Sequence, residues 1–295
     1  MRNARLAIVL VAACASAPRR ELVPAVNAHE AGAAAALFAE SADAELVAGP
    51  AFHGRAAIER ALGAVFARFP ATRIARGRTW VANDVRVIEL VWTATRGGKA
   101  IGIAGALVTR LDAAGRIAIA RLYLDVPTLV GQLDATKLPT GARTRAPITA
   151  PIAGTATIEA RGTAVETANL AIATASWARL DAHDPAGVLA AVAPTYIYDD
   201  LSGPAPLDAA GTRALLDGFL GLVGDFTIAT KPSLFAAGDD VITESVEHMT
   251  FQGRSITLHG LDIKHIVGGQ VVREWQYANG AEVLAALFGL ALEVP

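Results

Sequence analysis

Two acidic side chains that stand close to tyrosines are the residues of this chain best suited to acid–base chemistry. Asp199 follows Tyr198 directly, and Asp125 comes two residues after Tyr123. A carboxylate beside a carbon acid can remove its proton, and hydroxyl donors can stabilise the oxyanion that forms. Structural roles stay open for both acids: Asp199 could end a strand near a helix, and Asp125 could cap the helix that follows it.

Trp275, Tyr277 and Asn279 alternate along the chain, so on one strand they would share a face. Such a face could line a cavity. Tyr277 and Tyr123 could equally be packed strand aromatics whose hydroxyl groups are satisfied at the rim of a sheet.

His259, Asp262 and His265 have the composition of a metal-ligand set, but their spacing argues against one. On a strand the two histidines share a face and Asp262 points to the other, and the three span roughly 20 Å. We therefore expect no metal site. No cofactor is expected either, because the chain has no phosphate-binding glycine loop and no nucleophile elbow. His259 alone could line a cavity or lie at a surface.

The elements that must position these residues occur twice. A shift of about 154 residues superposes one half on the other, and in places the shift is one residue longer. The matched pairs are Gly49 and Gly203, Leu107 and Leu261, Tyr123 and Tyr277, and Glu89 and Glu244. A repeat of this length has the size of one small domain, so we expect two copies of one fold. The paired glutamates suggest a shared role, in a pocket or in an ion pair across the sheet.

Each copy places helices before strands. Apolar residues at helical spacing predict helices near residues 170–180 and 215–223, and Asp184-Pro185 predicts the start of a short one between them. The predicted strands are 85–95, 100–111 and 116–124 in the first copy, and 241–251, 255–267 and 270–278 in the second. Glycine-containing turns at 97–98, 114–115, 252–253 and 268–269 separate them. This order predicts an α+β class rather than a parallel, doubly wound sheet.

Composition shifts set the expected boundaries. Residues 134–166 are rich in Thr, Ala, Pro and Gly, which predicts a semi-extended linker. The expected organisation is a signal peptide at 1–13, a tether at 14–22, a first domain at 23–133, the linker at 134–166 and a second domain at 167–292.

The motif Tyr196-Ile197-Tyr198-Asp199-Asp200, followed by Gly203-Pro204, and the closing stretch 269–277 carry a family resemblance. Residues 115–125 repeat that closing stretch in the first copy. The chain resembles the nuclear transport factor 2-like superfamily, in its SnoaL-like (polyketide cyclase-like) branch, with ketosteroid isomerase as a cousin. The resemblance implies two cone-shaped α+β barrels, each a curved, mostly antiparallel sheet wrapped around three helices and an apolar pocket.

The same resemblance implies site residues and a domain arrangement. It places Asp199 where the family often has its base, and it makes Asp125 the candidate in the first copy. Neither copy keeps the whole polar set, because Asn279 stands opposite Asp125, and Glu45 opposite Asp199. Family members often pair through their sheets, so we expect the two copies to form an intramolecular pseudo-dimer. The candidate ligand-binding residues are Tyr198, Trp177, His259, Trp275, Tyr277, Asn279, Tyr123 and Trp92.

The N-terminus resembles a bacterial lipoprotein signal. Arg2 and Arg5 precede a short apolar run that ends in Val11-Ala12-Ala13-Cys14, and Cys14 is the only cysteine. Two acyl chains on this cysteine would anchor the protein stably. The alternatives are a core cysteine or an ordinary secretory signal. We expect export to the cell envelope, at the outer membrane or in the periplasm, with membrane contact only through the lipid.

The formal net charge of −2 and the lack of a basic block exclude an electrostatic footprint for nucleic acid. The function expected first is binding of a small apolar or mixed-polarity ligand. One alternative is an isomerase, cyclase or dehydratase that uses a pocket aspartate as acid or base. A structural or interaction module of the envelope is the other, and the sequence leaves open whether the protein is an enzyme.

Overall fold

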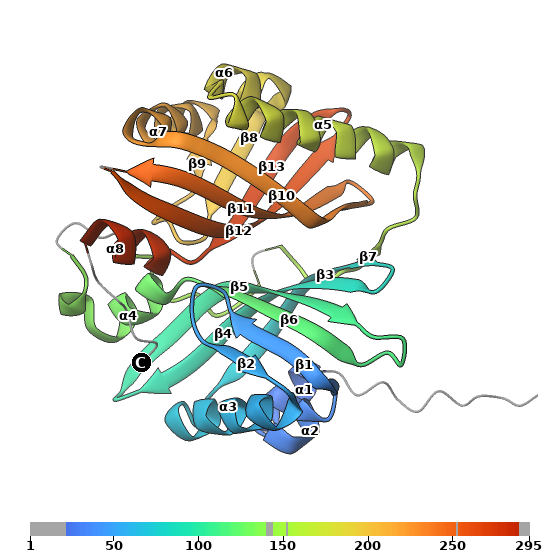
Figure 1. Cartoon of the computed structure of the whole chain (residues 1–295), viewed down its shortest axis with the longest axis vertical. Helices are drawn as coiled ribbons and strands as arrows, with labels where there is room; N and C mark the ends of the chain where they lie inside the picture. Colours follow the sequence, from blue (N-terminus) through green and yellow to red (C-terminus); the bar gives the residue numbers. More distant parts are fainter. Residues whose placement is uncertain (1–21, 140–143, 152, 252, 289–295) are drawn as a thin grey trace, which may run out of the picture.

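The computed structural model describes residues 22–139, 144–151, 153–251 and 253–288, and these form two domains built on one plan (Figure 1). In each domain a curved, mostly antiparallel sheet carries helices on one face. The predicted α+β class, with two tandem cone-shaped domains, is confirmed, although within the described residues neither sheet closes on itself. Predicted Cys14 and the signal segment lie outside the described residues.

The first domain runs from α1 to β7. Its elements are α1 (Leu22–Asn27), α2 (Ala31–Ala35), β1 (Phe38–Leu46), β2 (Ala51–His53), α3 (Arg55–Arg68), β3 (Arg73–Ala82), β4 (Val85–Arg96), β5 (Lys99–Leu111), β6 (Ile117–Leu124), α4 (Val126–Asp134), the 3-10 helix η1 (Ala135–Lys137) and β7 (Thr157–Glu159).

The second domain repeats this order. Its elements are α5 (Ala164–Asp181), α6 (Pro185–Val188), the 3-10 helix η2 (Leu189–Ala191), β8 (Val192–Asp200), β9 (Leu207–Asp208), α7 (Ala209–Leu222), β10 (Gly224–Ala237), β11 (Asp240–Phe251), β12 (Arg254–Val267), β13 (Gln270–Ala278) and α8 (Ala281–Phe288).

The strand orders of the two sheets match element by element. The first is β2-β1-β6-β5-β4-β3-β7, and the second, taken in the same direction, is β9-β8-β13-β12-β11-β10. In both, the first long strand pairs in parallel with the last one, β1 with β6 and β8 with β13. The six predicted strands are confirmed to within one residue of their ends, whereas the other described strands, β1 to β3 and β7 to β10, were not predicted.

Local sequence explains the turns and helix starts. Gly97, Gly98, Gly268 and Gly269 all have positive φ, between 57° and 80°, which the tight hairpin turns require. The predicted start of α6 is confirmed, because the Asp184 carboxylate accepts a hydrogen bond from the backbone of Gly187 at 2.8 Å and Pro185 takes the first helical position.

The two sheets pack face to face, and the helices α1–α3 and α5–α7 lie on the outer sides (Figure 1). A single core cluster therefore crosses the domain boundary. It is built on fully buried side chains of both sheets: Trp80, Val87 and Ala106 from the first, and Ile242, Leu261 and Ile263 from the second. Burial of one such large side chain contributes roughly 1.5–3 kcal/mol, so the domains stabilise one another as a pseudo-dimer within one chain.

The segment predicted as a linker makes contacts that its composition did not indicate. β7 pairs in parallel with β3, the backbone of Ile148 donates to Gly102 at 3.0 Å, and Ile148 and Ile158 pack on the shared core. This correction has a simple cause, because a proline-rich segment can still lie along a sheet edge that offers free backbone groups.

Among the described helices, none combines the length and the apolar character that crossing a bilayer requires.

Candidate functional site

The second domain encloses a cavity of about 240 Å³ between its helices and the inner face of its sheet. α5 contributes Trp177, and α7 contributes Leu215, Leu216 and Phe219. Only about 10–15 Å³ of such volume is needed to hold one water molecule, so the cavity has room for an organic molecule.

Strand alternation brings charged side chains onto the cavity wall. Asp262 and Lys264 on β12, and Glu274 on β13, all lie on the inner face. The Lys264 ammonium donates to the Glu274 carboxylate, which also accepts a hydrogen bond from the Tyr196 hydroxyl at 3.0 Å. Lys264 and Glu274 are thus matched in charge. Burial, together with the neighbouring Glu274, raises the pKa of Tyr196, so this hydroxyl stays a donor.

Asp262 differs from these neighbours because one of its oxygens has no partner. The side chain is 1% exposed, and Oδ2 makes no hydrogen bond within the described part of the chain. Burial, then the negative charge of Glu274, raises its pKa well above the ordinary value despite the nearby Lys264 ammonium. An unpaired carboxyl oxygen in such a wall is costly for stability.

Glu247 on β11 is a second carboxyl on the wall. Its contact is a hydrogen bond from the Ser245 hydroxyl at 3.3 Å. Burial, and to a lesser degree the charge of Glu282, raises its pKa to about 7. Near neutral pH this group is therefore divided between its protonated and ionised forms.

The remaining wall combines aromatic rings with hydrogen bonds. The Tyr198 hydroxyl donates to the side chain of Gln276, and the Trp177 indole donates to Thr243 at 3.3 Å. Burial raises the pKa of Tyr198 well above its usual value. Tyr198 and Trp177, both predicted as ligand contacts, thus lie on the cavity.

The cavity acids were missed because the repeat was aligned one residue out of step in β5. In the ladders, Glu89 lies opposite Ala106 and Glu244 lies opposite Leu261. The structural counterpart of Leu107 is therefore Asp262 rather than Leu261. A shift of one residue exchanges the two faces of a strand. The misalignment therefore assigned Asp262 to the face of β12 that lies away from the cavity. Pairing Glu244 with Leu261 would have shown that the next residue of β12, Asp262, faces the cavity, because side chains alternate along a strand.

The same positions are apolar in the first domain. Asp262, Glu274 and Glu247 correspond to Leu107, Ala120 and Trp92, which all belong to the first domain's interior core. Trp92, a predicted ligand contact, packs edge-on against Phe69 with ring centroids 5.1 Å apart.

Asp199 does not line the cavity, which corrects its assignment as the pocket base. Its neighbours Tyr198 and Asp200 face inward, so Asp199 must face the other side of β8. There it is 2% exposed and accepts from Arg145, in the predicted linker, at 2.7 Å and from Arg273 at 3.4 Å. This acid holds the linker to the second domain.

Asp125 and Asn279 are helix caps that join the domains, which corrects the catalytic role of Asp125, whereas Asn279 also lies at the edge of the second-domain cavity, as predicted. Asp125 accepts from Thr128 at the start of α4 and, at 3.0 Å, from the backbone of Gly280 in the other domain. Asn279 accepts in return from the backbone of Val126 at 3.3 Å. Burial raises the pKa of Asp125 to about 6.

Tyr123 and Tyr277 form a second reciprocal pair across the interface and do not line the second-domain cavity. Tyr277 donates to Glu89 of the first domain at 2.7 Å, and Tyr123 donates to Glu244 of the second at 2.8 Å. The repeated glutamates thus both accept a hydrogen bond from a tyrosine of the opposite domain.

Each glutamate takes its arginine from a different element. Arg78 on β3 holds Glu89 with two bonds of 2.8 Å, within the same domain. Arg121 on β6 reaches across the interface to Glu244, with hydrogen bonds of 2.7 Å from Nε and 2.5 Å from Nη2.

Of the other predicted contacts, His259 lies on the wall of the second-domain cavity, and Trp275 lies at the interface. Trp275 stacks under the Arg78 guanidinium, 3.9 Å from the ring centroid. His259 hydrogen-bonds Glu282 of α8 at 2.7 Å, and this contact raises its pKa. His265 bonds Asp240 at 2.7 Å. His259 and Asp262 both line the cavity, whereas His265 lies outside it against Asp240.

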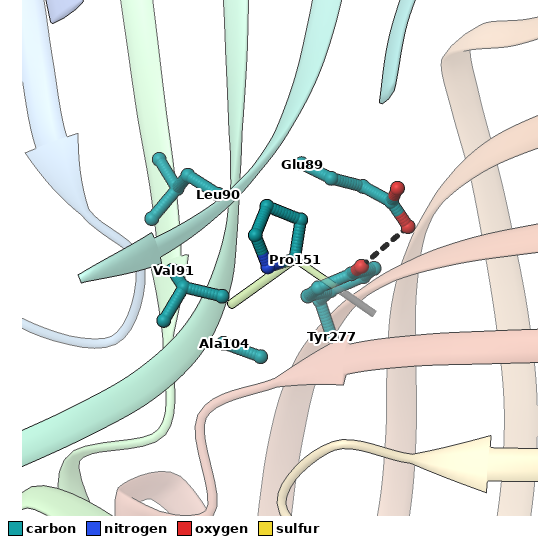
Figure 2. Close-up of a pocket in the computed structure, with 6 residues that line it drawn as sticks. All are labelled: Glu89, Leu90, Val91, Ala104, Pro151 and Tyr277. Atoms are coloured by element: carbon teal, nitrogen blue, oxygen red, sulfur yellow. Dashed lines mark hydrogen bonds between the residues drawn. The ribbon is translucent and has the colours of Figure 1, made fainter. Parts of the chain in front are cut away.

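A second, water-sized cavity of about 10 Å³ lies between the domains. Figure 2 shows Pro151 of the predicted linker between Leu90 and Val91 on one side and the Tyr277–Glu89 hydrogen bond on the other. This volume suits one water molecule at most.

Comparison with known proteins gives a family. Residues 20–120 and residues 173–274 each match the model described as a SnoaL-like domain. No curated protein matches the chain. Among solved structures, an NTF2-like protein from Burkholderia thailandensis is similar at 23% identity, over 40% of this chain and 96% of that one, with a TM-score of 0.37. An LEH-like epoxide hydrolase from M. tuberculosis is similar at 19% identity, over 42% and 92%, with a TM-score of 0.37.

Proposed function

Because the chain belongs to the SnoaL-like domain family in both halves, we propose that it binds a small molecule of mixed polarity in its second domain. The observation that carries this proposal is the cavity of about 240 Å³ with the unpaired Asp262 oxygen on its wall. Ligand sites are usually concave and largely apolar, with few polar groups that fix orientation.

The contrast with the first domain supports the interpretation that the cavity serves a function and is not a packing defect of the fold. Leu107, Ala120 and Trp92 show that this fold can fill the same space with apolar core. The second domain instead places Asp262, Glu274 and Glu247 there, which costs folding free energy that an apolar core would not. A ligand that satisfies these groups accounts for their presence.

The test is retention of a ligand by the intact second-domain cavity. Protein purified from its own host is examined by native mass spectrometry, and a panel of neutral, cationic and anionic small molecules is screened by calorimetry. The matched variant is Ala278→Leu, which copies Leu124 of the first domain, since both residues lie opposite equivalent glycines of the ladder, Gly260 and Gly105. Ala278 lies on the cavity wall. We expect the variant to lose binding while it stays folded.

Two results would remove the proposal. One is the absence of any bound or binding molecule for the wild-type protein across the panel. The other is equal binding by wild type and Ala278→Leu, because the added side chain occupies the proposed site.

A second candidate is acid–base catalysis on the bound molecule. The observation that favours it is Glu247, which lies on the cavity wall with a pKa of about 7. A group with that pKa can both take and return a proton at neutral pH. Catalysis is supported if the wild type converts a retained ligand and Glu247→Gln binds that ligand without converting it. Unaltered ligand mass and structure with both proteins would count against it.

We also propose export and lipid anchoring at Cys14, on the strength of the residue pattern at 2–14 alone. Metabolic labelling with a fatty-acid analogue in the native host is expected to mark the wild type and to spare Cys14→Ala. Label on both proteins, or on neither, would contradict the proposal.

A further inference from the structure

The wall of the second-domain cavity carries more acid than base. Lys264 and Glu274 neutralise one another through their contact. The other carboxyls, Asp262 and Glu247, have no hydrogen bond or ion pair with a lysine or arginine within the described part of the chain. Asp200, at the cavity edge, accepts from the backbone and hydroxyl of Ser202. The site is therefore short of positive charge.

The shortage of positive charge is greatest around Asp262. The charged groups around it are Glu274 on β13, Lys264 on β12, Glu247 on β11 and Asp200 on β8, so three acids oppose one base. Protonation of the carboxyls reduces this excess of negative charge, and the pKa values of Asp262 and Glu247 are accordingly raised. A cation placed against Oδ2 of Asp262 relieves it equally, and it supplies the missing hydrogen-bond or charge partner.

The aromatic part of the wall suits the same kind of ligand. Trp177, Tyr196, Tyr198, Phe219 and Phe226 all line the cavity. Faces of such rings attract cations, most strongly where water is excluded. The protein already uses this property, because the Lys264 ammonium lies 4.9 Å from the centroid of the Trp177 ring.

Building on the ligand-binding function proposed above, we infer that the cavity is selective for a small organic cation, an amine or a quaternary ammonium group, held against Asp262 and Glu247 and the aromatic wall. An anion would meet unpaired carboxyls there. A neutral molecule of the same shape would fill the volume and leave the acids without a partner.

The experiment compares two molecules of one shape and different charge. Choline and 3,3-dimethylbutan-1-ol, in which carbon replaces the nitrogen, are titrated into the full chain by calorimetry at pH 8. We expect choline to bind at least tenfold more tightly. Asp262→Asn, which keeps the shape of the side chain, should remove that preference and leave the weak binding of the alcohol unchanged.

Asp217→Asn is the matched control, because Asp217 is an exposed acid on the outer side of α7 that pairs with Arg213 at 2.7 Å. It should bind choline as the wild type does. Glu247→Gln provides a second cavity variant if Asp262→Asn does not fold, and it should lower choline affinity several-fold.

Equal affinity for choline and the alcohol would overturn the selectivity for cations while leaving the ligand-binding function intact. Choline binding that survives in both cavity variants would place the cation elsewhere and overturn the inference. Failure of wild type to bind choline would also overturn it, and the panel with Ala278→Leu would then decide the ligand-binding function separately.

Discussion

The two domains share a fold and a common interface, and they differ in what their sheets enclose. The first sheet wraps a core of side chains such as Leu107, Ala120 and Trp92. At the same positions the second sheet carries Asp262, Glu274 and Glu247 around a cavity of about 240 Å³. The sheet faces that meet at the interface show the opposite behaviour, because Tyr123 and Tyr277 make the same hydrogen bond in each direction.

This comparison separates the residues that hold the molecule together from those that can bind something. Polar groups repeated in both copies lie at the interface, where each needs its counterpart. Asp262, Glu274 and Glu247, which have apolar counterparts in the first copy, lie inside the second cone, where we propose that a ligand binds. The first domain thus acts as an internal reference that shows how the second would be built without a site.

The largest expected effect concerns the interface that the domains share. Arg78→Met leaves the buried Glu89 without its cation, which costs about 3–5 kcal/mol of unfolding free energy, whereas Asp240 keeps its contact with His265. Arg121→Met should cost less, because the Arg121 side chain is 27% exposed and that of Arg78 is 9% exposed. Urea unfolding measures both. Equal losses of unfolding free energy, or no loss for Arg78→Met, would show that burial does not determine how much each arginine contributes.

The next effect is a dependence of stability on pH that belongs to the second domain's interior. Burial raises the pKa of Glu247 from 4.5 to about 7. An acid that holds its proton more tightly when folded stabilises the folded state fully below about pH 4.5, and this contribution is lost as pH rises to about 7. The loss amounts to about 3 kcal/mol.

Glu247→Gln removes that titration, so its stability relative to the wild type should increase from pH 5 to pH 8 by about this amount. Unfolding by urea at the two pH values gives the comparison. A constant difference between the two proteins would mean that Glu247 ionises freely in the folded state.

A smaller change converts one position of the cavity to its counterpart in the first domain. Asp262→Leu copies Leu107 and removes a buried carboxyl oxygen that has no partner among the described residues. We expect a gain of about 2 kcal/mol in unfolding free energy, together with loss of ligand binding. A loss of stability would show that Asp262 is satisfied in the absence of a ligand.

Local signals in the sequence predicted most of the fold but little of the site. Paired glycines and β-branched runs fixed six strands, because turns and strands follow from nearby residues. Asp262 was missed because its face depends on the register of β12 against β11, which the one-residue difference in the repeat obscured. Asp125 and Tyr277 were assigned to a pocket because the sequence carries no sign that their partners, Gly280 and Glu89, lie in the opposite domain.

The smallest expected effect tests whether the two caps at the interface are interchangeable. Asp125→Asn gives the first domain the residue that the second has at Asn279, and Asp and Asn are similarly effective as helix caps. The change in stability at pH 7 should stay within about 1 kcal/mol, whereas Asp125→Ala should cost more because Gly280 and Thr128 lose their acceptor.

The dependence of stability on pH tests whether the charge of Asp125 matters at this cap. Burial raises the pKa of Asp125 from 3.8 to about 6, so the wild type loses stability from this group as pH rises between those values. Asp125→Asn cannot titrate and should be less sensitive to pH over that interval, as measured by thermal unfolding. Because Asn279 already fills the equivalent position without a charge, a wild-type-like pH response in Asp125→Asn would mean that the charge of Asp125 has no part in joining the domains.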